Sequence, residues 1–279
     1  MDRLVSAGIP VRRTPEMTTP DNTRQAPVSR RDFVRAASLA ATAAATCMGL
    51  PAMRGQPPVP ECSPVPAGTA GAPRPGAGLL QVEAPLAAIG EHVCGLHFYS
   101  GDMSRQVVAQ HYCSHVSGDI RQCVIYDSDR KHARLVGVEY IISARLFEEL
   151  PADEKRLWHS HVYEVKSGQL IAPGIPAGAE REVMQGLVGT YGKTWYTWQA
   201  DRGDKVPLGI PQLMMAFTAD GQVAPRLLAD RDREYGIASE EKRKDRAGIV
   251  APAVQSGADA WQGGEAIELR AAAVKMNGG

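Results

Sequence analysis

After residue 90 the chain consists of short apolar runs separated by polar and turn-forming residues. Short runs rich in Val, Ile, Tyr, Phe and Trp, bounded by Gly, Asp, Ser or Pro, are typical of β-strands. The strands predicted in this way are His92 to Ser100, Arg121 to Asp127, Arg134 to Ile142, His159 to Val165, Thr194 to Ala200 and Gln212 to Thr218. The turn Ser128 to Lys131 predicts that the second and third strands form a hairpin.

A helical spacing of apolar residues, three and four positions apart, predicts helices between these strands. The predicted helices are Met103 to His115, Ser143 to Phe147, Pro151 to Trp158, Ala177 to Tyr191 and Arg226 to Arg246. Asp102 and Ser143 are suited to cap the first two helices, and Gly192 is suited to end the fourth. Adjacent pairs of strands interrupted by single helices favour an α+β fold, a single compact domain with a mostly antiparallel sheet flanked by helices.

Composition divides the chain unevenly. Thirteen of the 20 prolines lie in residues 1–85, whereas 15 of the 16 aromatic residues follow residue 90. Residues 54–89 are rich in Pro, Gly and Ala, which predicts a disordered tether. We therefore expect one folded domain over residues 90–254 and a flexible C-terminal tail over residues 255–279.

The N-terminal region resembles an export signal. Ser29-Arg30-Arg31-Asp32-Phe33-Val34-Arg35 matches the twin-arginine (Tat) motif, and residues 36–53 carry no charge and are dominated by Ala. This predicts a Tat-type signal over residues 1–53, export by the Tat machinery to the periplasm or the medium, and a soluble mature protein without an integral membrane span. Because the Tat route carries folded proteins, often with a cofactor, it motivates a search for a cofactor site.

Charge and motifs exclude several function classes. The chain has 31 Lys and Arg against 31 Asp and Glu, so it lacks the basic surplus expected of a nucleic-acid partner. No GxSxG, Walker, GxGxxG or HExxH motif is present. The predicted domain contains three cysteines, Cys94, Cys113 and Cys123, so at most one pair can form a disulfide, and the alternative is that they are buried as small apolar residues.

The histidines are the one local concentration of possible chemistry, because all seven lie between residues 92 and 161. On the predicted helix, His111 and His115 are four positions apart and share the core-facing side. On the predicted strand, His159 and His161 alternate and share a face, which allows both imidazoles to reach one ion.

Two carboxylates can complete such a site. Glu139 is isolated in the apolar run of residues 135–142, where a carboxylate is costly unless it is paired or bound to metal, or lies on an edge strand. Glu164 lies on the opposite face of the predicted strand from His159 and His161, so it joins them only through a bulge or at the strand end. The candidate metal ligands are therefore His111, His115, His159, His161, Glu139 and Glu164, and the candidate cofactor is a divalent transition metal.

Two other interpretations of these histidines stay open, namely packed structural residues and a metal-free acid–base site. We expect His92, His97 and His132 to be structural or exposed. No residue is identified as catalytic or as a ligand of an organic cofactor.

A family resemblance runs through most of the predicted domain. The strings HFYSGDMSRQV, HYCSHVSGDIRQCVIYDSD, ARLVGVEYIIS, LWHSHVYEVKSGQL, YGKTWYTWQADRGD and PLGIPQLMMAFT occur in order over about residues 90–250. In these strings the chain resembles the oil body-associated protein family, a family of unknown function, and the Tat motif indicates an exported bacterial member. The resemblance implies no catalytic residue and no cofactor. We expect an unassigned activity with a histidine-rich metal site, or alternatively a peripheral lipid-binding or protein-interaction module that takes lipid or a small apolar ligand.

Overall fold

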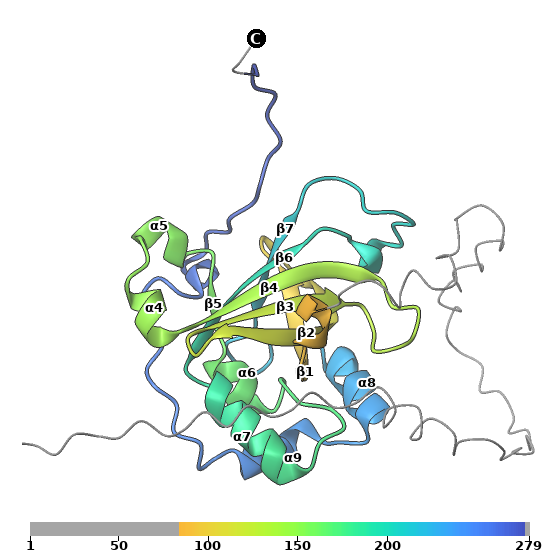
Figure 1. Ribbon diagram of the computed structural model, residues 1–279, viewed down its shortest axis with the longest axis vertical. Coiled ribbons are helices and arrows are strands. Elements are labelled where there is room, and N and C mark those ends of the chain that lie inside the picture. The colour runs from red at the N-terminus through yellow and green to blue at the C-terminus, as the bar shows by residue number, and fades with distance from the viewer. Residues whose placement is uncertain (1–83, 277–279) are drawn as a thin grey trace, which may run out of the picture. The chain divides into compact units, whose positions relative to one another are not determined.

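The computed structural model describes residues 84–276 (Figure 1). The predicted Tat signal and nearly all of the predicted tether lie outside these residues. The strands are β1 (Glu91–Tyr99), β2 (Asp102–Ser117), β3 (Ile120–Tyr126), β4 (Leu135–Ser143), β5 (His159–Ser160), β6 (Thr190–Tyr196) and β7 (Gln212–Ala216). The helices are α3 (Ala84–Ala87), α4 (Ala144–Glu148), α5 (Ala152–Lys155), α6 (Val162–Ser167), α7 (Ala177–Leu187), α8 (Pro225–Tyr235) and α9 (Ser239–Asp245), with short 3-10 turns η1 (Ala200–Arg202) and η2 (Ala260–Gly263).

The sheet closes on itself. Its strands follow the order β4-β3-β2-β1-β7-β6-β5, and β4 also pairs with β6. All of these pairings are antiparallel, so β1, β2, β3, β4, β6 and β7 form a six-stranded barrel, with β5 added beside β6. The predicted antiparallel sheet is therefore present. The predicted α+β class is corrected, because the sheet closes into a barrel and the fold is β-rich, not an open sheet flanked by helices.

Alternating side chains divide the core between the inside and the outside of the barrel. Along β1, Leu96 and Phe98 pack outward against a cluster that includes Phe217. Val93, at one end of the interior, packs against residues of α6 and α7 such as Val165 and Leu187. A third cluster, around Tyr99, Tyr196 and Met214, fills the other end. Helices α6, α7 and α9 gather at the first end (Figure 1), so both ends of the interior are filled.

Several predicted elements differ from the structure. The predicted helix Met103 to His115 is wrong, because these residues belong to the long strand β2. The predicted strand His159 to Val165 is reduced to two residues and continues as helix α6. Gly192 does not end a helix but lies inside β6. The predicted helix Arg226 to Arg246 is split into α8 and α9 at Gly236, which has a left-handed φ of 61°.

The predicted cap of the helix after residue 143 is confirmed. Ser143 caps α4, accepting a hydrogen bond from Leu146 N–H at 3.4 Å. The sequence left open whether any of the three cysteines pair. Cys113 and Cys123 form a disulfide across β2 and β3, and the Cys94 thiol is free and buried. None of the helices within residues 84–276 is long and apolar enough to cross a membrane.

Candidate metal centre

A cluster of four histidines and two glutamates lies between the two apolar ends of the barrel interior. The members are His97 of β1, His111 of β2, Glu139 of β4, His159 of β5, and His161 and Glu164 at the start of α6. Each of these residues is at most 4 % exposed. Groups that are charged or strongly polar in water are buried at this depth only when they are paired, hydrogen-bonded or bound to an ion.

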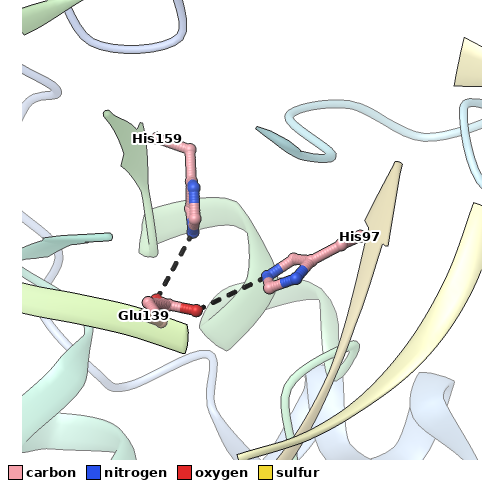
Figure 2. Close-up of side chains that lie close together, drawn as sticks. All are labelled: His97, Glu139 and His159. Atoms are coloured by element: carbon pink, nitrogen blue, oxygen red, sulfur yellow. Dashed lines mark ion pairs between the residues drawn. The ribbon is translucent and has the colours of Figure 1, made fainter. Parts of the chain in front are cut away.

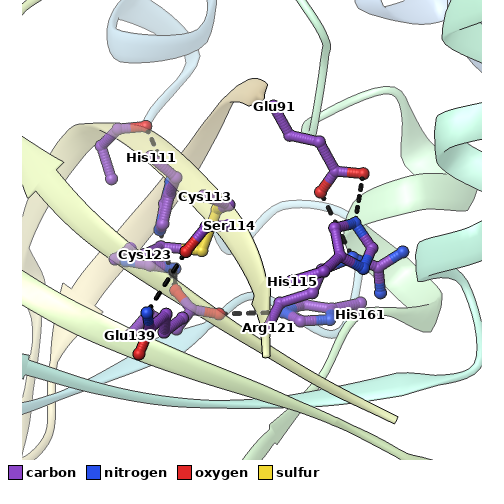
Figure 3. Close-up of a disulfide and its surroundings, with 12 residues drawn as sticks. Glu91, His111, Cys113, Ser114, His115, Arg121, Cys123, Glu139 and His161 are labelled. Atoms are coloured by element: carbon purple, nitrogen blue, oxygen red, sulfur yellow. Dashed lines mark hydrogen bonds and ion pairs between the residues drawn. A yellow bond between two sulfur atoms is a disulfide. The ribbon is translucent and has the colours of Figure 1, made fainter. Parts of the chain in front are cut away.

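The carboxylate of Glu139 is the centre of the cluster. Its Oε2 lies 2.8 Å from His111 Nε2 and 3.8 Å from His97 Nε2. Its Oε1 lies 3.2 Å from His161 Nε2 and 3.7 Å from His159 Nε2. Figure 2 shows His97 and His159 pointing at Glu139 from two sides, and Figure 3 shows His111 and His161 doing the same. Four imidazoles therefore present the same ring nitrogen to one carboxylate.

The outer ring nitrogens fix which nitrogen carries the proton in two of these histidines. His111 Nδ1 lies 3.2 Å from the carbonyl oxygen of Ala109, which can only accept a hydrogen bond. His161 Nδ1 lies 2.8 Å from Thr190 Oγ1, whose own hydroxyl donates to the carbonyl of Leu187 at 2.7 Å. Both Nδ1 atoms must therefore be the donors. With Nδ1 as the donor, each Nε2 faces Glu139 either as the second N–H of an imidazolium or, in a neutral imidazole, as a lone pair. A cation, either a proton or a metal ion, must then lie between each Nε2 and the carboxylate.

Glu164 adds a second buried carboxyl group to the cluster. Its Oε2 lies 3.9 Å from His159 Nε2 and 4.0 Å from His161 Nε2. Neither this oxygen nor His159 Nε2 has a hydrogen-bond partner among residues 84–276. Two unsatisfied buried polar atoms that face each other are rare in folded proteins and call for a ligand.

Burial and the neighbouring charges shift the pKa values within the cluster. Burial lowers the pKa of His97 well below its ordinary value and lowers that of His159 to about 3, so both imidazoles are neutral. Burial, together with the nearby Glu139, raises the pKa of Glu164 well above its ordinary value. Burial also acts to raise the pKa of Glu139, but His111, His161 and His159 outweigh it and hold that pKa well below the ordinary value.

The ligand atoms are close enough to share an ion. Two groups of three, His97 with Glu139 and His159, and His159 with His161 and Glu164, have their ligand atoms within 4.8 Å of one another. Nitrogen and oxygen ligands lie about 2.1 Å from a transition metal, so two ligands of one ion can be about 4 Å apart. Small shifts of the side chains therefore suffice to bring each group onto an ion.

Gly192 and a small cavity leave room at the centre of the histidine and glutamate cluster. A Cβ atom added to Gly192 would lie 2.6 Å from His159 Nε2 and would also collide with Glu139 Oε1. The cavity beside these groups measures about 10 Å³, close to the volume of one water-sized sphere. Its polar side is formed by His97, His111, Glu139, His161 and Glu164, and its apolar side by Val93, Ile141, Leu170 and Leu187.

Comparison with known proteins places the domain in a family. Residues 83–250 match the family described as "Protein of unknown function (DUF1264)". The chain belongs to this family. It is 43 % identical over 193 residues to oil body-associated protein 1B of Arabidopsis thaliana, covering 69 % of this chain and 80 % of that protein. It is 46 % identical over 175 residues to oil body-associated protein 1A of Zea mays, covering 63 % and 74 %. No solved structure matches the chain.

Within this DUF1264 domain, five of the six predicted ligands come together, and His115 does not. The His115 side chain is 48 % exposed, and its Nε2 lies 3.0 Å from Glu91 Oε1 near the end of β2 (Figure 3). On a strand, four residues span about 13 Å instead of the 6 Å of a helix, so His111 and His115 cannot reach one ion. Glu164 joins the cluster because α6 is a helix, on which positions three apart lie on one side.

His97 is the member of the cluster that sequence reasoning missed. Of the two alternatives predicted for His97, exposure is wrong, because its side chain is buried and its Nε2 faces Glu139, whereas a structural role stays a prediction. Its position in the correctly predicted first strand could have indicated that it is buried. Val93, His97 and Tyr99 alternate on one face of that strand, so the histidine shares the face of apolar neighbours rather than the solvent face.

Proposed function

We propose that the centre of the barrel binds a divalent transition metal ion, with His97, His111, His159, His161, Glu139 and Glu164 as the ligand set. The observation that carries this proposal is the orientation of His111 and His161. Their outer nitrogens are committed as donors, and their inner nitrogens face the same carboxylate. Mixed imidazole and carboxylate ligands suit divalent iron, manganese, cobalt and zinc.

Two simpler explanations account for less of the geometry. Histidines that only packed the core would be expected to satisfy their ring nitrogens, yet both nitrogens of His159 lack partners in the described chain. A metal-free acid–base site would need room for a substrate, and the cavity of about 10 Å³ holds only one water-sized species. A metal ion would fit that space and would pair the inner nitrogens of His111 and His161 with Glu139.

We also propose that the protein is a bacterial protein exported through the Tat pathway to the periplasm or the medium. Two features support export: the twin-arginine motif at residues 29–35 and the Cys113–Cys123 disulfide. Disulfides form and persist in oxidising compartments outside the cytosol. A buried metal centre is also compatible with a route that carries folded proteins.

Elemental analysis of the untagged protein, purified from its natural compartment, tests the metal proposal. We expect near-stoichiometric metal in the wild type and loss of that metal in a His159→Ala/His161→Ala double variant. His115→Ala is the matched control, because this histidine lies on β2 but outside the cluster, and it should keep the metal. A metal-free wild-type protein, or a double variant that retains the metal, would contradict the proposal.

A groove on the outer face of the barrel favours a second candidate function, the binding of an apolar ligand or a lipid surface. It measures about 270 Å³ and lies between α3 and strands β2 to β4. Its lining includes Leu86, Tyr112, Val124, Val138 and Tyr140, and similar proteins in plants are named for oil bodies. Flotation with phosphatidylcholine vesicles checks this candidate: wild-type protein should float with the vesicles, and Tyr140→Ser should float less.

A further inference from the structure

The strand that carries His159 is held weakly by the barrel itself. Strand β5 has only two residues, and its ladder with β6 consists of the pairs His159 with Gly192 and Ser160 with Tyr191. These two pairs engage only one edge of β5, whereas a metal ligand must be held to within about 0.5 Å. Something beyond β6 must hold its other edge.

That edge is closed by the segment 255–262, here called the C-terminal strap. Asp259 Oδ1 accepts a hydrogen bond from Ser160 N–H at 3.1 Å, and Asp259 N–H donates to the carbonyl of Trp158 at 3.0 Å. These two bonds flank His159 on both sides. Asp259 is itself only 4 % exposed and has a left-handed φ of 52°, which is uncommon for a residue other than glycine.

Further contacts fix the C-terminal strap along its length. Gln255 N–H donates to the hydroxyl of Tyr191 at 2.9 Å. The ring of Trp261 packs edge-on against Phe98, with 5.0 Å between ring centroids. Gln262 Nε2 donates to Thr218 Oγ1 at 2.5 Å. The first part of the tail that the sequence predicted to be flexible is therefore packed on the barrel.

We propose that the C-terminal strap completes the metal centre, with Asp259 as the positioning residue of His159. The inference rests on the metal binding proposed above. It extends the centre to residues that follow the family match, which ends at residue 250. The stretch matched by the family model therefore does not include Asp259.

Metal affinity and the absorption spectrum of the cobalt(II)-loaded protein test this role. Asp259→Gly removes the acceptor without backbone strain, since glycine adopts a left-handed φ freely. Because Asp259 acts on His159 through the backbone of Trp158 and Ser160 and not through its ring, we expect the variant to weaken cobalt binding by roughly 10-fold, the lower end of the cost of losing an outer partner of a metal ligand, and to change the spectrum. Asp259→Asn keeps an acceptor oxygen at the same place, so its cobalt affinity and spectrum should match those of the wild type.

Gln262→Ala is the matched control, because it removes a hydrogen bond of the C-terminal strap that does not reach β5. It should leave the affinity and the spectrum unchanged. An Asp259→Gly protein that loses thermal stability but keeps the cobalt affinity and the spectrum of the wild type would overturn the inference. The C-terminal strap would then be a structural element only. If Asp259→Gly does not fold, Asp259→Glu serves instead, since its displaced carboxylate should also change the spectrum. A wild-type protein that binds no cobalt would defeat the metal proposal itself, so the two failures are distinguishable.

Discussion

Thr190 determines the chemical state of His161 from outside the cluster. Its hydroxyl proton is committed to the carbonyl of Leu187, so its oxygen accepts the Nδ1 proton of His161 and turns the Nε2 atom toward the centre. Outer partners of this kind set the tautomer, the orientation and the basicity of metal-bound histidines. A residue that never touches the ion can therefore control how tightly it is held.

Replacing Thr190 by Val keeps the shape of the side chain and removes the acceptor. We expect Thr190→Val to lower metal affinity by about 10- to 100-fold, measured by competition with a chromogenic chelator. Thr194→Val is the control, because Thr194 lies on the same strand and its buried hydroxyl has no partner among residues 84–276. Equal affinities for the two variants would show that the hydroxyl of Thr190 does not orient His161.

Asp259 makes folding stability depend on pH. Burial raises its pKa from 3.8 to about 7, against a smaller opposing effect of the hydrogen bond from Ser160 N–H. Between these two values the folded protein holds a proton that the unfolded chain has lost, so the stability contribution of Asp259 falls as pH rises. Full ionisation of the buried carboxyl group costs on the order of 4 kcal/mol, since a change of one in pKa corresponds to about 1.4 kcal/mol.

The Asp259→Asn variant lacks this titration. We expect it to match the wild type in urea unfolding near pH 4 and to be more stable above pH 7, with the difference growing between these values. Asparagine also tolerates the left-handed backbone at this position. A constant difference across the same pH range would rule out a raised pKa for Asp259.

At the scale of elements, strand β2 shows what the sequence can and cannot reveal. Residues 107, 111 and 115 share one face in a helix, and they also share one face in a strand, because all intervals of four are even. The prediction that His111 faces the core therefore survives the wrong choice of element, whereas the prediction that His115 joins it does not. The local spacing of residues predicts which side of an element a side chain lies on. The rise per residue, which differs between a helix and a strand, decides whether two such side chains can reach one another.

The segment 159–164 shows that a local pattern can predict a strand without predicting where it ends. Its alternating His-Ser-His pattern predicts a strand, and the strand is real but ends after two residues, where α6 begins. Glu164 reaches the cluster only because of that change of element. A two-residue strand is stabilised by its partners, here β6 and Asp259, rather than by its own sequence. Tertiary contacts of this kind are not visible in local patterns.

At the scale of the whole molecule, closure of the sheet is what assembles the centre. Its ligands extend from residue 97 to residue 164, and they meet because β4 pairs with β6 and β1 pairs with β7. Local sequence patterns predict the strands but not these long-range pairings. Closure also surrounds the centre with paired strands and apolar clusters, and each ligand is at most 4 % exposed.

This enclosure leads to a kinetic expectation for the metal. A chelator cannot approach ligands that are at most 4 % exposed, so release must wait for the domain to open. We expect metal loss to excess EDTA to take roughly hours to days at 25 °C, to be independent of EDTA concentration, and to accelerate with urea in parallel with the unfolding rate followed by tryptophan fluorescence. Release in direct proportion to EDTA concentration would mean that the chelator reaches the folded centre. The barrel would then have an entrance near the cluster, and the ion would be exchangeable in the folded protein rather than captured during folding.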